Sequence, residues 1–327
     1  MVVIFVMKLV MDQRNYKRSM SRSNPLFYGK ILLFGEYGII KDSMGLSIPH
    51  TYYKGAFQFE PSFNKEQSKS NENLFKYLAY LKTDEAPCRF NTTAFESDLN
   101  NGLYFDSSIP QGFGVGSSGA LVAAIYDRYC EEKISKNPQQ SSDIKALKKI
   151  FSWMESYFHG KSSGIDPTIC YMGLPLLIKS KDELGSVRLP SASSGAGAVF
   201  LLNSGAPGET QPMVEIFMEK LKEEGFRNML KNQFVKYNDA CIKAFVEGDT
   251  TPLFSNLKKL SKLVLENFEP MIPKGFHDLW KQGLESEEYF LKLCGSGGGG
   301  FVMGFTRDYD KTSELLKKYQ PEVVYRF

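Results

Sequence analysis

The segment "IPQGFGVGSSGALVAAIYD" (109–127) places the tightest constraint on how this chain can fold. Three glycines stand at alternate positions directly before an apolar pattern with helical spacing. Glycine lets backbone N–H groups approach an anion without a Cβ clash, and Ser117 and Ser118 add hydroxyls where the helix begins. The positive end of a helix dipole also favours phosphate. The segment therefore predicts a phosphate-binding loop; a glycine turn capped by serine ahead of a core helix is the alternative.

Residues 114–119 also match the dinucleotide fingerprint G-x-G-x-x-G. That fold requires a strand running into the first glycine and an acidic residue about twenty positions later, at a strand end. Pro110 interrupts any such strand, and "EKISKNPQQSSD" is not a strand end. A Walker A loop requires a lysine after its last glycine, and none follows Gly116. A nicotinamide site and a P-loop are both disfavoured.

The composition is that of a soluble globular protein of one large or two medium domains. The chain has 327 residues, with 40 basic and 37 acidic side chains and a net charge of +3. This balance predicts neither a nucleic-acid partner nor a membrane partner. The 5 cysteines are scattered without a C-x-x-C pattern, which indicates reduced thiols in a cytoplasmic protein and no zinc site.

Residues 1–23 stand apart from the rest of the chain. Their apolar start, "MVVIFVMKLV", is too short to span a bilayer, and the positive charges follow it rather than precede it, unlike in a signal peptide. We expect this segment to be disordered or a non-native extension, with Met20 as the true start.

Strands and helices alternate in mixed order, which predicts an α+β fold. A stretch rich in serine and glycine at 191–198 separates two apolar runs, so we expect one domain over 24–185 and a second over 186–327. Strands are expected at 27–40 (broken at Gly35), 46–60, 289–295, 301–306 and 322–327, hairpins around Asn101-Gly102 and over 169–180, and helices at 71–83, 120–133, 143–160, 212–247, 251–267, 277–286 and 309–319.

The segment "HGKSSGIDPT" (159–168) follows the helix that carries Glu155. Gly160 ends that helix, and the serine-glycine turn brings Asp166 to a loop or strand start. Two carboxylates near one phosphate loop suit one metal ligand and one base. The alternative is that Glu155 lies on a solvated helix face and Asp166 in an ordinary turn.

The segment "CGSGGGGFVMGF" (294–305) carries four consecutive glycines between two apolar runs. An ordinary hairpin does not need four glycines, which cost much backbone entropy on folding. Close approach of the backbone to a ligand or to another loop explains them better than a loose turn does.

Together these segments resemble the GHMP kinase superfamily, named for galactokinase, homoserine kinase, mevalonate kinase and phosphomevalonate kinase. "GKILLFGEYGII" (29–40) is similar to its first motif, and "CGSGGGG" (294–300) to its third. "PQGFGVGSSGA" (110–120) is similar to its phosphate loop P-x-x-x-G-L-G-S-S-A, with Val115 for leucine and Gly119 for alanine. "HGKSSGIDP" resembles the mevalonate kinase pattern H-G-x-P-S-G-x-D, with Ser162 in place of proline.

The resemblance implies a two-domain GHMP kinase fold, with an N-terminal domain like ribosomal protein S5 domain 2 and a ferredoxin-like C-terminal domain. It implies that the chain binds ATP and Mg²⁺, that Asp166 and Lys30 are catalytic, and that Ser118 and Glu155 hold the metal. It also implies substrate contacts from Glu36, Tyr37 and Gly164, and ATP contacts from Pro110, Gly112, Gly114, Gly116, Ser117, Ser118, Gly119, Gly297 and Gly298.

The implied reaction is phosphorylation of mevalonate to 5-phosphomevalonate, a step in isoprenoid precursor synthesis and lipid metabolism. The partner is therefore a small molecule, and the resemblance is compatible with a homodimer. Mevalonate kinases usually read G-E-H where this chain has Gly35-Glu36-Tyr37, a reading commoner in phosphomevalonate kinases. Phosphomevalonate or a sugar is therefore the alternative acceptor, and a catalytically inactive nucleotide-binding family member is a further alternative.

Overall fold

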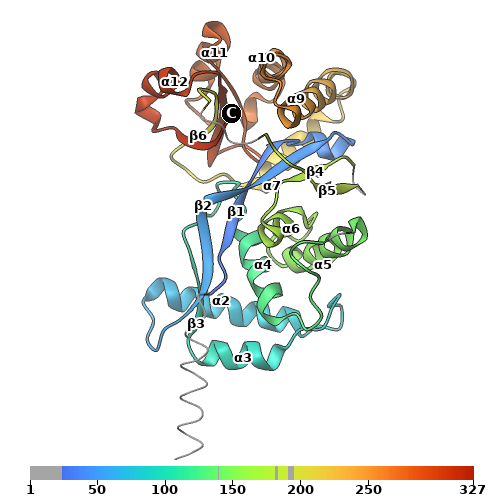
Figure 1. Ribbon diagram of the computed structural model, residues 1–327, viewed down its shortest axis with the longest axis vertical. Coiled ribbons are helices and arrows are strands. Elements are labelled where there is room, and N and C mark those ends of the chain that lie inside the picture. The colour runs from blue at the N-terminus through green and yellow to red at the C-terminus, as the bar shows by residue number, and fades with distance from the viewer. Residues whose placement is uncertain (1–23, 139, 181–182, 191–194) are drawn as a thin grey trace, which may run out of the picture.

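The computed structural model describes residues 24–138, 140–180, 183–190 and 195–327 (Figure 1). Two antiparallel sheets, each with its own helices, lie toward opposite ends of an elongated molecule. The predicted extension at 1–23 and residues 191–194 of the predicted boundary lie outside the described residues. Across the described part, no helix combines the length and apolar character that crossing a membrane requires.

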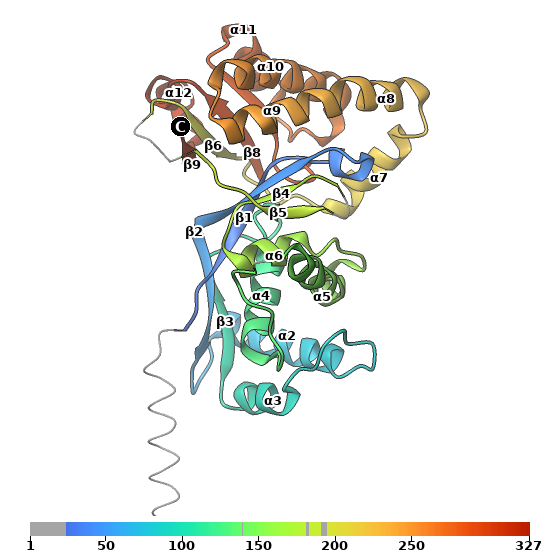
Figure 2. The same ribbon diagram turned by 45° about the vertical axis from the view of Figure 1, so that its right-hand side comes forward.

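The long strand β2 (Gly45–Phe59) organises the first sheet. Its partner along most of its length is β1 (Phe27–Phe34), and the two form a hairpin that extends toward both ends of the molecule (Figure 2). The C-terminal end of β2 pairs with β3 (Leu103–Ser107), and its N-terminal end pairs with β4 (Leu176–Ile178). With β5 (Leu184–Ser186) beside β4, the order is β1-β2-β4-β5, and β3 lies beside β2.

Two helices pack against the β1–β2 hairpin and against each other. These are α4 (Ser117–Tyr129), which follows the glycine loop, and α6 (Ile165–Met172), which carries Asp166. Both are buried along most of their length because small and apolar residues predominate in them. The other helices of this half are α2 (Lys65–Leu81), α3 (Thr92–Asn100) and α5 (Ser141–His159), with the short 3-10 helix η1 (Gly38–Lys41) after β1.

The predicted hairpin around Asn101-Gly102 is wrong. The residues before it form helix α3, whose first turn is capped by the Asn91 side chain accepting a hydrogen bond from the backbone N–H of Ala94 (2.9 Å). Phe95 and Leu99, four residues apart, are both buried on one face of that helix. The asparagine-glycine pair therefore connects a helix to β3, since the helical spacing of the apolar residues outweighs the local turn signal.

Three further local predictions are wrong. Ile169 was expected in a hairpin and Asp166 in a loop or strand start, but both lie in helix α6. Pro167 is compatible with this helix because proline is tolerated in a first turn, where its missing N–H has no intrahelical partner. After Gly35 the chain forms η1 rather than a second strand.

The second sheet has the order β7-β8-β6-β9, with all neighbours antiparallel. Helices from this half of the chain cover it (Figure 2). Its strands are β6 (Ala198–Asn203), β7 (Tyr289–Leu293), β8 (Phe301–Thr306) and β9 (Glu322–Arg326). Its helices are α7 (Thr210–Lys220), α8 (Glu224–Met229), the π-helical turn η2 (Leu230–Phe234), α9 (Val235–Glu247), α10 (Thr250–Asn267), the 3-10 turn η3 (Glu269–Met271), α11 (His277–Ser286), α12 (Tyr309–Leu315) and the 3-10 turn η4 (Lys317–Tyr319).

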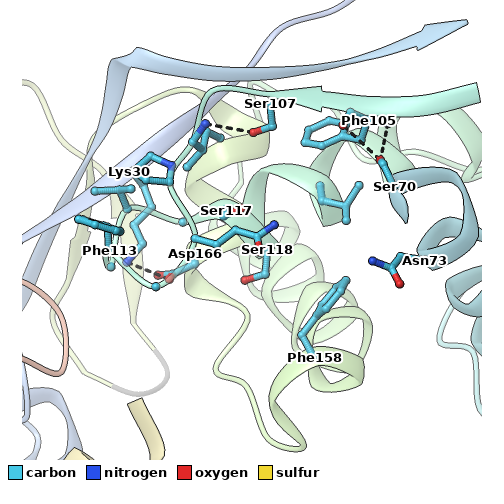
Figure 3. Close-up of a pocket in the computed structure, with 18 of the residues that line it drawn as sticks. Lys30, Ser70, Asn73, Phe105, Ser107, Phe113, Ser117, Ser118, Phe158 and Asp166 are labelled. Atoms are coloured by element: carbon cyan, nitrogen blue, oxygen red, sulfur yellow. Dashed lines mark hydrogen bonds and ion pairs between the residues drawn. The ribbon is translucent and has the colours of Figure 1, made fainter. Parts of the chain in front are cut away.

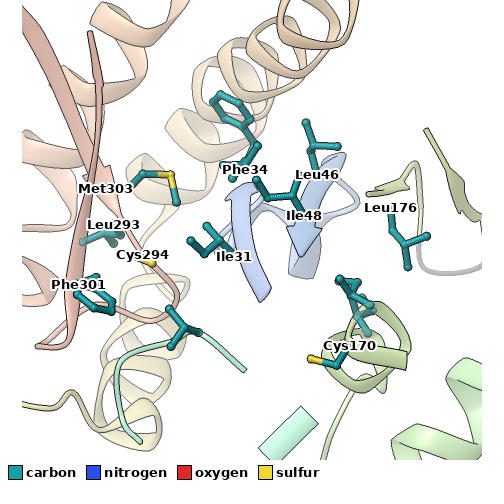
Figure 4. Packing of buried hydrophobic residues seen from close by; sticks show 14 of the residues in the cluster. Ile31, Phe34, Leu46, Ile48, Cys170, Leu176, Leu293, Cys294, Phe301 and Met303 are labelled. Atoms are coloured by element: carbon teal, nitrogen blue, oxygen red, sulfur yellow. The ribbon is translucent and has the colours of Figure 1, made fainter. Parts of the chain in front are cut away.

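The hydrophobic core runs continuously through both halves. In Figure 4 the hairpin residues Ile31 and Phe34 lie between Met303 of the second sheet and Leu176 of the first. Ile31, Phe34 and Met303 have essentially no exposed surface, which shows how tightly the hairpin is held from both sides. This mixed architecture confirms the predicted α+β class, and the hairpin holds its flanking loops at the joint between the two sheets.

Candidate active site

A cavity of about 980 Å³ opens beside the predicted phosphate loop (Figure 3). Its walls come from helix α2, strand β3, the loop before helix α4 and the glycine-rich loop after strand β7. Such a volume lies within the range of pockets that hold nucleotide-sized ligands. Segments far apart in the sequence therefore meet around one space.

The loop before α4 rests directly on strand β1. The backbone N–H of Lys30 donates to the carbonyl of Val115 (2.9 Å), and Gly116 has a φ of 83°, in the left-handed region. A Cβ at Gly116 would lie 2.8 Å from Lys30 Cγ, so only glycine fits this turn. The turn points the N-terminus of α4 toward the cavity. Of the predicted ATP-binding residues in this loop, the cavity is lined by Pro110, Gly112, Gly114, Gly116, Ser117 and Ser118.

Gly119 does not line the cavity. It lies behind the loop, where a Cβ would come within 3.0 Å of the backbone of Asp166 and Pro167. This close approach lets helix α4 pack against helix α6. The residue therefore has a packing function in this structure.

The four-glycine segment packs against the phosphate loop through a third loop around residue 207. The N–H of Gly208 donates to the carbonyl of Gly112 (2.8 Å), and the N–H of Gly300 donates to the carbonyl of Ala206 (2.7 Å). Gly297 lines the cavity, whereas Gly298 does not and donates its N–H to the carbonyl of Met271 (2.6 Å). The structure thus brings the two glycine-rich segments together, as the sequence suggested.

Lys30 and Asp166 form an ion pair at the edge of the cavity. The Lys30 ammonium lies 2.8 Å from Asp166 Oδ2, and dashed lines mark this contact in Figure 3. The lysine side chain is 6% exposed and the aspartate side chain 40% exposed. Burial, the largest single effect, would lower the pKa of the Lys30 ammonium, but the attraction and hydrogen bond of Asp166, with smaller contributions from Cys294 and Cys170, together raise it. The lysine is therefore charged, and Asp166 is the member of the pair that a ligand can reach.

Ser118 at the start of α4 contacts Glu155 of α5, whose side chain is buried. The Ser118 hydroxyl donates to Glu155 Oε1 (3.0 Å), and the Ser162 hydroxyl donates to the other carboxylate oxygen, Oε2. Burial, followed by repulsion from Asp166, raises the pKa of Glu155 to about 7.

The Ser118–Glu155 pair fits the implied Mg²⁺, which prefers hard oxygen donors. A cation beside Glu155 would also stabilise the buried carboxylate. No cluster of three or more histidine, cysteine, aspartate or glutamate side chains suited to a metal occurs in the described residues. Mg²⁺ at this pair would thus take its remaining ligands from phosphate and water, its usual arrangement in phosphoryl-transfer sites.

The three predicted substrate-binding residues do not line the large cavity. Glu36 is buried and forms an ion pair with Lys292 of β7 (2.6 Å), and burial raises the pKa of Glu36 despite the attraction of Lys292. The Tyr37 hydroxyl donates to the carbonyl of Ser296 (2.6 Å), and Tyr37 has a positive φ of 59°. Gly164 is the N-cap of helix α6. Glu36 and Tyr37 therefore hold the two sheets together behind the glycine-rich loop.

The sequence reasoning missed the cavity wall formed by helix α2. Glu66, Lys69, Ser70 and Asn73 line the cavity and follow the i, i+3, i+4, i+7 spacing of one helix face. Asn64 and Gln67 form a capping box, so α2 begins at Lys65, six residues before the predicted start. That cap and the polar stripe were visible in the sequence. The aromatic wall residues come from two segments that no local pattern connects: Phe105 lies in β3, and the adjacent Tyr157 and Phe158 lie in α5.

Part of the chain matches a known family domain. Residues 75–174 match the model of the GHMP kinases N terminal domain. No curated protein shows significant similarity to this sequence.

Solved structures match almost the whole chain at low sequence identity. Mevalonate kinase from Leishmania major in complex with R-mevalonate has a TM-score of 0.62 at 14% identity, covering 91% of this chain and 91% of that one. Phosphomevalonate kinase from Streptococcus pneumoniae, in complex with phosphomevalonate and AMPPNP, has a TM-score of 0.62 at 14% identity, covering 93% and 99%. Galactokinase from Lactococcus lactis in complex with galactose has a TM-score of 0.61 at 14% identity, covering 97% and 99%.

These matches confirm the resemblance to the GHMP kinase superfamily: the chain carries its N-terminal domain and has its fold. Members of this family are phosphotransferases that act on alcohol groups and bind ATP. Mevalonate kinases are among the structural neighbours.

Proposed function

We propose that the protein is an ATP-dependent kinase that phosphorylates the hydroxyl of mevalonate to give 5-phosphomevalonate. The observation that carries this proposal is the Lys30–Asp166 ion pair, which opens into the cavity beside the glycine loop. Phosphoryl transfer to an alcohol uses an aspartate, placed beside a phosphate-binding loop, that can accept the hydroxyl proton. The proposed product would serve isoprenoid precursor synthesis.

ATP would lie with its phosphates over residues 112–119 and its nucleoside along helix α2 and strand β3. The first intrahelical hydrogen bond of α4 runs from the N–H of Ala120 to the carbonyl of Gly116 (3.0 Å). Ser117 and Ser118, in the turn before that bond, line the cavity, so the positive end of the helix dipole would face the phosphates. Asn73 and Phe158 line the other end of the cavity, where they provide an amide and an aromatic face for a base. The AMPPNP bound by the pneumococcal relative supports nucleotide binding by this fold.

Ser118 and Glu155 would hold Mg²⁺ through the hydroxyl and the carboxylate that now share a hydrogen bond. When bound, the metal neutralises charge on the phosphates. Glu155 is 4% exposed, so its position is set by packing rather than by solvent.

Asp166 would accept the proton of the acceptor hydroxyl. The Lys30 ammonium, 2.8 Å from Oδ2, holds the Asp166 side chain in place at the edge of the cavity. The main contribution of Asp166 would be to orient the acceptor hydroxyl for attack. The Lys30 ammonium would also stabilise negative charge on the transferring group.

Phosphomevalonate or a sugar is the second candidate acceptor. Tyr37 stands where mevalonate kinases usually have histidine, and the TM-scores of the phosphomevalonate kinase and galactokinase matches are 0.62 and 0.61, close to the 0.62 of the mevalonate kinase match. A catalytically inactive nucleotide-binding protein is a weaker candidate, because Lys30, Ser118, Glu155 and Asp166 are all in place.

The test is release of ADP from Mg·ATP with mevalonate, phosphomevalonate, galactose, homoserine or no acceptor. ADP release that depends on mevalonate alone supports the proposal. Release with phosphomevalonate or galactose instead keeps the kinase and replaces the acceptor. Binding of ATP without turnover on any acceptor contradicts the proposed activity.

A further inference from the structure

Ser162 departs from the pattern that the rest of its segment follows. Where the mevalonate kinase pattern has proline, this chain has a residue with a hydroxyl. It lies in the turn between α5 and α6, seven positions after Glu155. Its hydroxyl donates to Glu155 Oε2, the oxygen opposite the one that meets Ser118.

The hydrogen-bonding pattern at Ser162 fixes the direction of its hydroxyl. The N–H of Gly164 donates to Ser162 Oγ (3.0 Å), so one lone pair of that oxygen is used. The hydroxyl proton is thereby directed to Glu155. The carbonyl of Ser162 in turn accepts from the Ser152 hydroxyl (2.6 Å) of helix α5, which anchors the turn to the helix that carries Glu155.

The turn has little freedom to adjust. Gly164 has a φ of 72°, and a Cβ there would lie 2.1 Å from the carbonyl oxygen of Lys148 in helix α5. The backbone is therefore pressed against α5, and Ser162 cannot move away from Glu155 without breaking that contact. The carboxylate is held between two serine hydroxyls that belong to different elements, one at the start of α4 and one in this turn.

We propose that Ser162 is a positioning residue for the metal-binding carboxylate of Glu155. It holds Oε2 so that Oε1 and the Ser118 hydroxyl face the phosphate loop together. This inference rests on the proposed function, because it assumes that Glu155 and Ser118 hold Mg²⁺. Partners that orient a metal ligand typically change metal affinity about 10–100-fold when they are removed.

The experiment compares Ser162→Ala with Ser162→Thr, which keeps the hydroxyl, and with Ser163→Ala as a matched control. Ser163 is the adjacent serine, and its hydroxyl oxygen accepts a hydrogen bond from the N–H of Ile165 (3.4 Å). The main measurement is the affinity for AMPPNP by calorimetry, with and without Mg²⁺. It reports on the metal without any turnover, and thermal unfolding of each variant checks the fold.

Ser162→Ala should reduce the Mg²⁺-dependent gain in AMPPNP affinity about tenfold, while metal-free affinity stays the same. Ser162→Thr and Ser163→Ala should keep most of the gain. In turnover assays, the apparent KM for Mg²⁺ should rise about tenfold in Ser162→Ala, with a smaller change in kcat at saturating Mg²⁺.

An unchanged Mg²⁺-dependent gain in Ser162→Ala would overturn the inference, as would equal losses in Ser162→Ala and Ser163→Ala. Absence of any gain in the unsubstituted protein would overturn it together with the proposed metal site. A third outcome is that the protein does not phosphorylate mevalonate while Ser162→Ala still loses the Mg²⁺-dependent gain in AMPPNP affinity tenfold. That result would support the positioning role of Ser162 and reject only mevalonate as the acceptor.

Discussion

Two buried lysines, one on a strand of each sheet, form ion pairs that differ in how far their carboxylates are exposed. Lys30 on β1 lies 2.8 Å from Asp166, and their side chains are 6% and 40% exposed. Lys292 on β7 lies 2.6 Å from Glu36, and their side chains are 5% and 6% exposed. The first pair can exchange a partner for a ligand, whereas the second is closed to one.

The Lys292–Glu36 pair, closed to ligands, connects the segment after β1 of the first sheet to β7 of the second. Lys292 also donates to the carbonyl of Leu293 (3.0 Å), and Tyr37 reaches Ser296 of the glycine-rich loop. Glu36 and Tyr37 come directly after the turn that follows β1, so the segment is attached to the second sheet at two places. The comparison teaches that chemically similar ion pairs can support catalysis or hold a fold together, according to which carboxylate solvent can reach.

The largest expected effect is on the open pair. Asp166→Asn should lower turnover about 10²–10⁴-fold, because the neutral amide cannot accept the proton of the acceptor. AMPPNP binding should persist, as measured by calorimetry beside the ADP-release assay. Asp310→Asn, at an exposed position of α12, is the matched control and should keep turnover. Near-normal turnover of Asp166→Asn would reject its assignment as the base.

Breaking the Lys292–Glu36 pair should lower the stability of the fold. Lys292→Met leaves Glu36 buried without its cation, which should lower the free energy of unfolding by about 3–5 kcal/mol. Urea unfolding measures this loss. The double variant with Glu36→Gln should recover part of it, because no isolated charge then remains. If Lys292→Met loses less free energy of unfolding than Asp166→Asn does, the exposed pair rather than the buried one holds the fold together, and the comparison is reversed.

Glu155 offers a third kind of buried carboxylate, held by serine hydroxyls. Its pKa of about 7 predicts that protons compete with Mg²⁺ below that pH. The Mg²⁺-dependent gain in AMPPNP affinity should fall about tenfold for each pH unit below 7. Calorimetry over a pH series measures this fall, and a gain that is flat across pH 7 would contradict the prediction.

The metal-free protein should show the opposite trend in stability. The folded pKa of Glu155 is raised from 4.5 to about 7, so the folded state binds more protons than the unfolded state between these values. The contribution of Glu155 to stability should therefore decline as pH rises from 4.5 through 7. Glu155→Gln is the control that removes this dependence.

The smallest effect is expected at an exposed ion pair. Lys82 and Glu96 lie 2.7 Å apart, but their side chains are 44% and 49% exposed. Lys82→Met should change the free energy of unfolding by less than about 1 kcal/mol, because water screens the pair. Urea unfolding of Lys82→Met and Lys292→Met under the same conditions compares the two losses of unfolding free energy. Equal losses in the two variants would show that burial does not decide the strength of these pairs.

Local patterns were sufficient for several parts of the site. The alternate glycines and Ser117 predicted a loop that opens a helix, and α4 begins at Ser117. The four-glycine segment predicted close backbone approach, and it packs beside the first loop. Other predictions failed where competing local signals were present, as at Asn101-Gly102, or where a serine-glycine turn was expected to lead into a loop or strand, as at Asp166.

The sequence also could not show which charges are paired. Lys292 and Glu36 stand 256 positions apart, and nothing local to either residue predicts their contact. Glu36 was expected to bind substrate because of its motif, yet its carboxylate faces the second sheet. Ser162 was noted only as a departure from proline, and its direction toward Glu155 appears only once the turn packs on α5.

The sequence by itself determined where the glycine loop turns into a helix, where the α5 helix ends and which family the motifs resemble. These features depend on φ preferences and apolar spacing, which act over a few residues. The tertiary structure alone decided that the carboxylate of Asp166 is exposed, that of Glu36 is buried in an ion pair, and that of Glu155 is held by serine hydroxyls. Burial and charge pairing depend on everything packed around a group, and that surrounding is assembled from segments more than a hundred residues apart, as for Lys30 with Asp166.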